Sequence, residues 1–516
     1  MAVTAAGAAA LLTVLALCLG SLAVAAAQGG LAGGFSAPDL RALRFTVLQA
    51  TLSSALSVGL AVPVTRALAR RRFPGRDAAL SLLGAPFLLP VIVAVIGVIA
   101  VWGRSGWLSE ISLGLGGPRL DVYGLPGVVI VHVFFNLPLA ARLMLQACAE
   151  VPAERWRVAA QLGMEGRALF AAVEWPALRS AAAAAFALTF LVCATSFAAA
   201  LALGGGPRAT TLEVAIYEAA RYEFDLGRAA RLAALQAGVC ALAAGLAYAA
   251  RAPMAAGAGV LRQAERFDGR GAWARAGDAA VLIAAAAFLL APIAAIMLRG
   301  APSLFLLGPE VLAAAARTAA VAVASAALCV AAALSLAALV TALQTRGRRG
   351  AALADLAGLA PVAASPFVIG VGVIVALRSF ADPFALAMPL TALINALAAT
   401  PFALRILTPA LRLGWEEHGR LAASLGLTGA TRLRAVYGAR LRGPLGFSAG
   451  LAAALSAGDL GVIALFATPD APTLPLLMHL LASSRQLDAA MAAALVLLAL
   501  CLALFRLFDL AGRSAR

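Results

Sequence analysis

The chain contains no lysine, and its 40 basic residues are all arginine. A nucleotide-binding P-loop needs a lysine before its serine or threonine, and Schiff-base catalysis needs a lysine amine. Both kinds of site are therefore excluded. If this protein uses ATP, another chain must hydrolyse it. We predict that the protein is not an enzyme and holds no cofactor of its own.

Cysteine and histidine are also scarce, with six and three residues. Most of the cysteines stand alone within apolar stretches, and none forms a Cys-x-x-Cys pair with another. The histidines are far apart in the sequence. Metal sites and disulfide frameworks need such residues in clusters of set spacing. We therefore expect packing roles for them and no bound metal.

Charged residues make up only 12% of the 516 residues, whereas 63% are hydrophobic and the mean hydropathy is +0.95. A water-soluble domain of this composition would expose apolar surface that it could not bury. Apolar runs of about 20 residues recur, the length that an α-helix needs to cross a bilayer. The sequence therefore predicts an all-α polytopic membrane protein. The sequence contains no soluble basic domain with interleaved aromatic residues, so nucleic-acid binding is not expected. About twelve transmembrane helices are expected, near 5–27, 45–67, 78–101, 125–146, 181–203, 230–250, 278–298, 316–342, 353–377, 389–410, 444–466 and 489–509.

A short arginine-containing loop occurs twice, 263 positions apart. The first copy, 157–163, reads RVAAQLG and the second, 420–426, reads RLAASLG. The same offset pairs Pro138 with Pro401. One constant offset over such a distance indicates an internal duplication. A membrane protein that repeats a polar loop would offer two equivalent sites to a two-fold partner.

Arginines gather in the loops after the second, sixth and eighth expected spans and in both copies of the repeated loop. The positive-inside rule places these loops, and both chain termini, in the cytoplasm of a bacterium whose inner membrane holds the protein. Both copies then face one side, so each repeat holds an even number of spans. We predict two parallel six-helix repeats, 1–250 and 278–516, joined by a cytoplasmic linker, 251–277. The repeated loops lie near 150–180 and 412–442.

The repeated loop resembles the EAA loop of type I ABC-importer permeases. Gly163 and Gly426 keep the place of the family's glycine, whereas Arg157 and Arg420 stand where the family has glutamate. The resemblance implies that each loop projects from the membrane into a cleft of an ATPase subunit, one of two copies that bind ATP and magnesium. The implied ATPase-coupling residues are Arg157, Ala159, Ala160, Gly163 and Met164 in the first loop and Arg420, Ala422, Ala423, Gly426 and Leu427 in the second.

Further stretches are similar to the permeases of thiamine ABC transporters. They are 69–76 (ARRRFPGR), 132–138 (HVFFNLP), 159–164 (AAQLGM), 203–213 (LGGGPRATTLE) and 447–466, which includes GDLG at 458–461. The similarity runs over nearly the whole chain. It implies that thiamine or its phosphate esters are the substrate and that a periplasmic thiamine-binding protein delivers it.

Asp459 is the one acidic residue that lies deep within an expected span. A carboxylate inside a membrane is costly and therefore suggests a function. Because thiamine is a cation, Asp459 and its repeat partner Ser196 are candidates for the substrate pathway. In the alternative interpretation, Asp459 bonds only hydroxyls or backbone where the helix is broken between Gly458 and Gly461.

The segment 210–228 follows a glycine-rich turn and is amphipathic. We expect it on the periplasmic side, either as a docking surface for the binding protein or as a solvated loop. Two other functions remain open. One is a fused permease of the same family for ferric iron or a polyamine. The other is a twelve-helix secondary transporter, which would need charged pairs within the membrane and no repeated glycine loops.

Overall fold

The computed structural model of the chain describes residues 34–77, 89–204, 209–249, 266–269, 271–345, 365–427, 437–466 and 470–513, with a few single positions before and between them. Every regular element in this part of the chain is a helix. Eight of the described helices are long and apolar enough to cross a membrane. The prediction of an all-α polytopic membrane protein is therefore confirmed. These eight are Ala37–Arg70, Val91–Gly114, Leu125–Ala149, Gly166–Ala194, Ala272–Gly300, Pro309–Gln344, Ala387–Gly419 and Leu487–Arg513.

The other expected spans have a different form. The span near 5–27 lies almost entirely outside the described residues, as do 251–265 and 270 of the expected linker. The span near 353–377 is described as a helix only over Pro366–Leu377, which is 12 residues long. The span near 444–466 is interrupted within its length. Helix α13 begins at Ala272, inside the expected linker.

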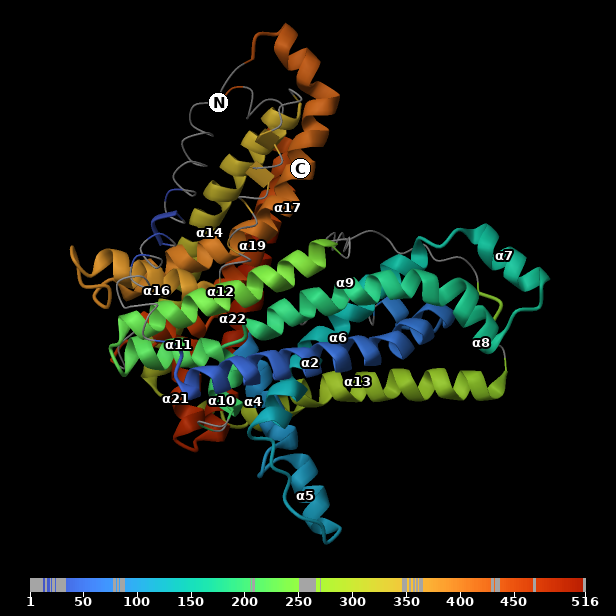
Figure 1. Cartoon of the computed structure of the whole chain (residues 1–516), viewed down its shortest axis with the longest axis horizontal. Coiled ribbons are helices and arrows are strands. Elements are labelled where there is room, and N and C mark those ends of the chain that lie inside the picture. Colours follow the sequence, from blue (N-terminus) through green and yellow to red (C-terminus); the bar gives the residue numbers. More distant parts are fainter. Residues whose placement is uncertain are drawn as a thin grey trace.

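Two arms of long helices diverge from a common junction (Figure 1). The first arm carries two short helices at its tip, and the second arm ends at the last turns of α17. The first arm contains α2 (Ala37–Arg70), α6 (Leu125–Ala149), α9 (Trp175–Ala194) and α13 (Ala272–Gly300), with α7 (Ala153–Gln161), α8 (Gly166–Leu169) and the π-helical turn η3 (Phe170–Glu174) at its tip. The second arm contains α14 (Pro309–Gln344), α17 (Ala387–Ser424) and α19 (Gly438–Ala457).

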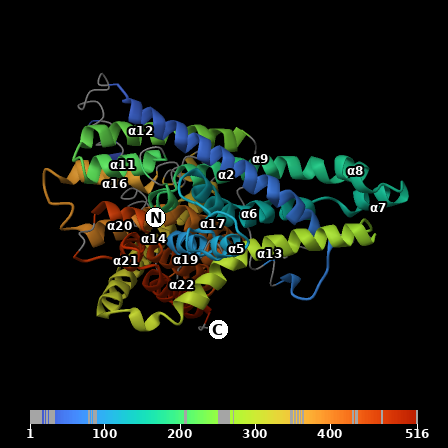
Figure 2. The same cartoon turned by 90° about the horizontal axis from the view of Figure 1, so that it is seen from below.

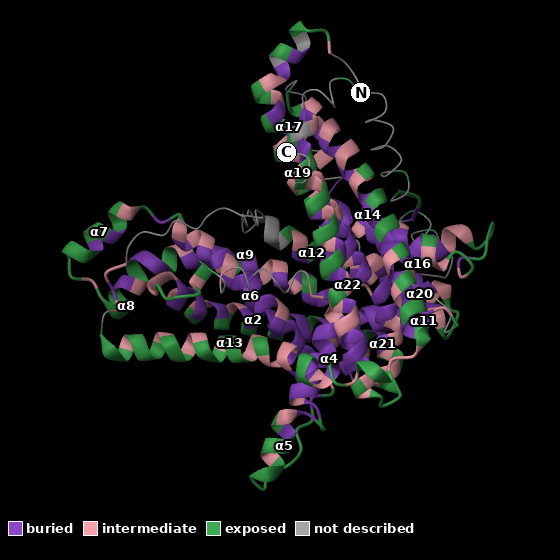
Figure 3. Cartoon of the chain, turned by 180° about the vertical axis from the view of Figure 1, so that it is seen from behind, coloured by how far each residue is buried: buried purple, intermediate pink, exposed green. Residues whose placement is uncertain are grey.

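The junction holds most of the short helices, together with α12 and α22, and the largest continuous core. Buried residues concentrate there and along the inner faces of the arms, whereas α13 and the tip of the first arm are largely exposed (Figure 3). The exposed side chains of α13 include Ile283 and Leu298, as suits a surface in contact with lipid. The junction contains α4 (Val91–Trp102), α10 (Ala198–Leu203), α11 (Leu212–Arg221), α12 (Leu226–Ala249), α16 (Pro366–Leu377), α20 (Gly461–Phe466), α21 (Leu474–Ser483) and α22 (Leu487–Arg513), while α5 (Trp107–Gly114) projects away from it and η4 (Leu304–Leu306) lies between α13 and α14.

The same hydrogen bond occurs in each half of the chain. The Leu212 amide at the start of α11 donates to Thr46 Oγ1 over 2.8 Å, and the Leu474 amide at the start of α21 donates to Thr318 Oγ1 over 2.8 Å. Each threonine is buried and donates in turn to the carbonyl four residues earlier. Paired contacts of this kind are what a duplicated unit would produce.

The first helix of the second half packs against the first half. A side chain on Gly97 of α4 would meet Pro292 Cβ of α13 at 2.9 Å, so only glycine permits this approach. In the second half, Gly372 of α16 lies against the Cys18 carbonyl, which a Cβ would meet at 2.4 Å. Close contacts thus run in both directions between the segments before and after the expected linker. The division at 250 and 278 stays a prediction.

Candidate functional site: the repeated loops and the helix breaks

The first repeated loop is a short helix closed by a glycine turn. Helix α7 ends at Gln161, and Gly163 follows with φ +62°, a conformation that favours glycine. The Met164 amide then donates to the Ala159 carbonyl over 2.9 Å, which closes the last turn. Arg157, Ala160 and Gly163 are exposed, whereas Ala159 is buried. The predicted residues therefore form one compact projection, in which Ala159 faces inward.

The second loop repeats this turn on a different support. Gly426 has φ +63°, and the Leu427 amide donates to the Ala422 carbonyl over 2.9 Å. Ala422 is buried, as Ala159 is in the first loop. Here, however, the helix before the turn is the end of the 38-residue α17 and not a separate short helix. Arg420 and Ala423 lie on this helix, and their side chains are outside the described part of the chain.

Each loop presents two apolar side chains to solvent. Val158 and Leu162 are 53% and 71% exposed in the first loop. Leu421 and Leu425, which stand at the same places in the repeat, are 58% and 63% exposed. In each pair the residues are four apart and share one helix face. Two equivalent apolar faces at the tips of the two arms are suited to two copies of one partner.

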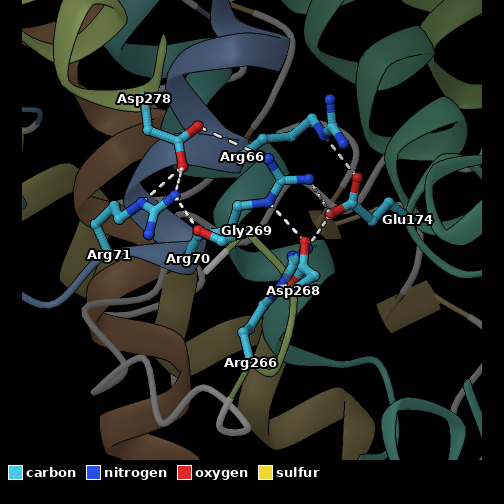
Figure 4. A network of polar contacts seen from close by, with 8 residues as sticks. All are labelled: Arg66, Arg70, Arg71, Glu174, Arg266, Asp268, Gly269 and Asp278. Atoms are coloured by element: carbon cyan, nitrogen blue, oxygen red, sulfur yellow. Dashed lines mark hydrogen bonds and ion pairs between the residues drawn. The ribbon is translucent and has the colours of Figure 1, made fainter. Parts of the chain in front are cut away.

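A buried carboxylate anchors the base of the first loop (Figure 4). Glu174, at the end of η3, is 1% exposed and accepts a hydrogen bond from Arg66 Nε of α2 over 2.6 Å. It also pairs with Arg266, and Arg70 Nη2 lies 3.7 Å from it. Because its charge is compensated by arginines from two other segments, Glu174 ties the loop to α2 and to residues 266–269.

The ion pairs continue from Arg266 and Arg70 toward α13 (Figure 4). Asp268 pairs with Arg266 Nε and with Arg70 Nε, each at 2.7 Å. Burial alone would raise the pKa of Asp268, but the two arginines outweigh it and hold that pKa below its ordinary value of 3.8. Asp278 of α13 pairs with Arg71 Nη2 at 2.7 Å. Four arginines and three carboxylates thus join α2, the loop base, residues 266–269 and α13.

Cation–π contacts extend this cluster into the loop itself. The Arg266 guanidinium lies 4.2 Å from the ring centre of Trp156 in α7, and Arg66 lies 4.6 Å from that of Phe170. The arginines near residue 70 were predicted to mark the cytoplasmic side and to belong to a stretch similar to thiamine permeases, and their pairing with Glu174 was not predicted. Glu174 is an acid next to Trp175 and Pro176 in an otherwise apolar stretch, which was the one local signal available.

The base of the second loop lacks a counterpart of Glu174 among the described residues. By the repeat offset, Tyr437 stands at the place of Glu174. The ion pairs described near the second loop are surface pairs, Arg412 with Glu416 at 2.8 Å and Arg440 with Glu417. Exposed pairs contribute little to stability. The two loops are thus alike at their turns and unlike at their bases.

The two candidate pathway residues lie at breaks in equivalent helices. Helix α9 ends at Ala194 and α10 begins at Ala198, so Ser196 lies between them. Helix α19 ends at Ala457 and α20 begins at Gly461, so Asp459 lies in the second break. Both residues are partly exposed.

Asp459 is bonded to the backbone of its own break. Its Oδ1 accepts from the Gly461 amide over 3.2 Å and its Oδ2 from the Val462 amide over 3.0 Å, so it caps α20. This is the contact that the alternative interpretation expects. The breaks also lie together, because a Cβ on Gly461 would be 3.6 Å from Phe197 Cδ1. Whether Asp459 and Ser196 line a pathway stays a prediction.

The expected surface at 210–228 is mostly buried, which corrects the interpretation as a solvated loop. Helix α11 packs against α2, α12 and α16, and nearly all of its residues, including Glu213, are buried. The reason is that Leu212, Val214, Ile216 and Ala219 give it apolar residues on several faces. Within this segment Glu218 and residues 222–225 are exposed.

The chain was compared with known proteins. No family model matches it. It is 40% identical over 506 residues to the thiamine transport system permease protein ThiP of Brucella abortus (strain 2308). The aligned residues cover 96% of this chain and 92% of the relative. It is 38% identical over 484 residues to the protein of that name from Escherichia coli (strain K12), covering 92% and 89%. The relative from Haemophilus influenzae is 33% identical over 472 residues, covering 89% and 86%. The similarity therefore spans nearly the full length of each pair.

Proposed function

Because this chain belongs to the family of thiamine transport system permease proteins, we propose that it is the membrane-spanning permease of an ATP-driven thiamine importer. The observation that carries the proposal is the 38–40% identity to relatives of that name along nearly the whole chain. The all-helical fold with its eight candidate spans is that of a multi-pass inner membrane protein. Thiamine phosphates are included in the proposed substrate class.

The two repeated loops are the proposed contacts with two copies of a separate ATPase subunit. Their support is the pair of identical turns at Gly163 and Gly426, each with two exposed apolar side chains beside it. ATP and magnesium bind to the partner subunits. When those subunits close, they move the two tips together, and the arms that carry the tips change their angle at the junction.

The tips face the cytoplasm in this proposal. Arg66, Arg70 and Arg71 lie at the end of α2 near the first tip, as the positive-inside rule expects. The end of α22 lies on the side of the second tip, because Gly512 contacts Arg442 near the start of α19. The C-terminus is then cytoplasmic, and the N-terminus is proposed to be so too.

The opposite end of the molecule faces the periplasm and receives a thiamine-binding protein. Figure 2 shows α11, α16 and α21 at the far end of the molecule from α7 and α8. The exposed surface there includes the acidic end of α11, with Glu218, Glu223 and Asp225. From this side thiamine passes the two helix breaks, where Asp459 provides a negative charge for the thiazolium cation and Ser196 a hydroxyl.

The test is uptake of radiolabelled thiamine into proteoliposomes that hold the chain with its ATPase and binding protein. Uptake should require ATP and should be lost in the double variant Gly163→Asp and Gly426→Asp. Gly116→Asp is the matched control, because Gly116 also has positive φ and open space around it but lies beyond α5, away from both tips. Thiamine uptake by the Gly116→Asp variant should persist.

Two results would overturn the proposal in different ways. Thiamine uptake that is independent of ATP and driven by a proton gradient would indicate a secondary transporter. ATPase activity stimulated by a binding protein loaded with iron or polyamine, without thiamine uptake, would keep the architecture and replace the substrate.

A further inference from the structure

Four aromatic rings from different segments form a continuous series at the junction of the arms. The ring centres of Phe367 and Phe197 are 4.4 Å apart, and those of Phe197 and Tyr217 are 5.2 Å apart. Tyr217 and Tyr222 follow at 5.4 Å. We call these four residues the aromatic ladder. The distances of the two pairs that include Tyr217 lie within the range of favourable ring–ring contact, and that of Phe367 and Phe197 lies at its lower limit.

The ladder runs from the molecule's interior to its outer surface. Phe367 and Phe197 are 3% and 5% exposed and Tyr217 is 9% exposed, whereas Tyr222 is 68% exposed. The only polar groups on the ladder's rings point along it, because the hydroxyls of Tyr217 and Tyr222 lie 3.2 Å apart. A ring cluster that served packing alone would end within the core. This one ends at an exposed ring.

Carboxylates stand at both ends of the ladder. At the inner end, Gly461 lies against both Phe197 and Phe367, and Asp459 Oδ1 is bonded to the Gly461 amide. At the outer end, Glu218 and Glu223 flank Tyr222 and are exposed, and of the two Glu223 already pairs with Arg228. Rings attract cations to their faces, and carboxylates attract them at longer range. The arrangement therefore matches a ligand that is both aromatic and positively charged.

The ladder is built from both halves of the chain. Phe197, Tyr217 and Tyr222 belong to the first half, whereas Phe367 begins α16 and Asp459 precedes α20 in the second. A Cβ on Gly461 would lie 2.9 Å from Phe367 Cε2, so glycine is needed for this approach. Phe367 and Asp459 belong to the second half of the chain, so a shift of one half against the other at the junction would separate them from the other three rings. The inner end would then open or close with that shift.

We propose that the aromatic ladder is the route and selection site for an aromatic organic cation between the outer surface and the helix break at Asp459. The inference rests on the proposed function and adds the residues that would contact the substrate. Thiamine fits this class because its thiazolium ring is a cation and its aminopyrimidine is a second aromatic ring. The rings replace water around the cation without binding it strongly enough to hold it in place.

The experiment compares thiamine with a neutral analogue in which carbon replaces the charged thiazolium nitrogen. Initial uptake rates of both are measured in the proteoliposomes described above, each loaded on the binding protein. Tyr222→Leu should lower the ratio of thiamine to neutral analogue about two- to fivefold, and Phe197→Leu about tenfold or more, since cation–π attraction is stronger when desolvated. Phe197→Tyr keeps the ring and should restore the ratio.

Phe224→Leu is the matched control for Tyr222→Leu, the substitution at the exposed end of the aromatic ladder. Phe224 is 70% exposed, two residues from Tyr222, and has no described ring contact with the ladder. Weakened docking of the binding protein would affect both exposed variants alike, so only a greater loss of ratio in Tyr222→Leu supports the ladder. Binding-protein-stimulated ATP hydrolysis in Phe197→Leu shows that this buried variant has folded.

The ladder is overturned if thiamine and its neutral analogue fall by the same factor, or if Phe224→Leu changes the ratio as much as Tyr222→Leu. Packing alone would give the first of these results. Failure of the proposed function looks different, because the unmodified complex would then import no thiamine at all.

Discussion

Replacing Glu174 by glutamine should loosen the base of the first loop. The substitution keeps the shape of the side chain and removes its charge. Glu174 is 1% exposed, and the arginines around it are 26%, 11% and 5% exposed for Arg66, Arg70 and Arg266. Removing one partner of a buried ion pair costs about 3–5 kcal/mol, because a charge is left uncompensated. We expect the low end, about 3 kcal/mol, since Arg66 can turn toward water and Arg266 keeps Asp268.

Two measurements on the purified complex test this expectation. The midpoint of thermal unfolding should fall in Glu174→Gln, and the number of ATP molecules hydrolysed for each thiamine imported should rise, because the loop no longer moves as one body with α2. Asp121→Asn is the matched control. Asp121 also pairs with an arginine, Arg104, at 2.7 Å, but both side chains are more than half exposed. Loss of this exposed pair should leave both the unfolding midpoint and the number of ATP molecules hydrolysed per thiamine unchanged.

The reasoning would be refuted if Glu174→Gln unfolded at the same temperature as the unmodified protein and kept its transport ratio. The cluster would then contribute no more than a surface pair. A fall in unfolding temperature without any change in the transport ratio would leave Glu174 as a stabilising residue only.

Three further predictions concern the helix break, the linker and the loops. Asp459→Asn keeps one of the two cap bonds through its amide oxygen, so the unfolding temperature should fall only slightly, whereas thiamine uptake should fall at least several-fold; unchanged uptake in a folded complex would exclude Asp459 from the pathway. Folding lowers the pKa of Asp268, so the contribution of its charge to stability should be constant from pH 8 to about pH 5 and should be lost as the pH falls below 3.8. Thermal unfolding of Asp268→Asn and of the unmodified protein, measured over this pH range, would check this. Leu162→Asp and Leu425→Asp should each weaken ATPase binding in a pull-down at least about tenfold, whereas Leu115→Asp, at a still more exposed leucine beside α5, should not; equal binding by all three would contradict the assigned contacts.

What the sequence predicted well depends on local pattern. Apolar runs predicted the helices, since length and hydropathy alone determine whether a helix can span a bilayer. The glycine shared by the two repeated loops, Gly163 and Gly426, marks the place of the turn in each, because both adopt a backbone conformation that other residues rarely take. The helix break at Gly458 to Gly461 was also expected as one alternative, since two glycines bracket an acid there.

What the sequence could not predict depends on contacts between distant segments. Glu174 meets Arg66 and Arg266, which are 108 and 92 residues away in the chain. No local pattern signals such a pairing. The burial of α11 was missed for a related reason, because its charged residues suggested a solvated surface. Glu213 is nevertheless buried where α11 packs against other helices, and Gln236 of α12 donates to it over 3.2 Å.

The two loops differ in how a push at their tips would reach the membrane helices. In the second half the loop is the last part of α17, so a displaced tip moves a continuous rod of 38 residues. In the first half α7 is separated from α6, and the loop is connected to the membrane helices by the continuous segment Gly166–Ala194 and by the ion pairs of Glu174 with Arg66 and Arg266. A helix transmits force through its own hydrogen bonds, whereas an ion-pair cluster transmits it only while the charges stay paired. If two ATPase subunits bind the tips as proposed, equal movements of the two would be transmitted by a continuous helix in the second half and partly by an ion-pair cluster in the first. Because the cluster includes residues 266–269 and Asp278 of α13, and α13 packs on α4 of the opposite half, a push at the first tip also reaches the interface between the halves.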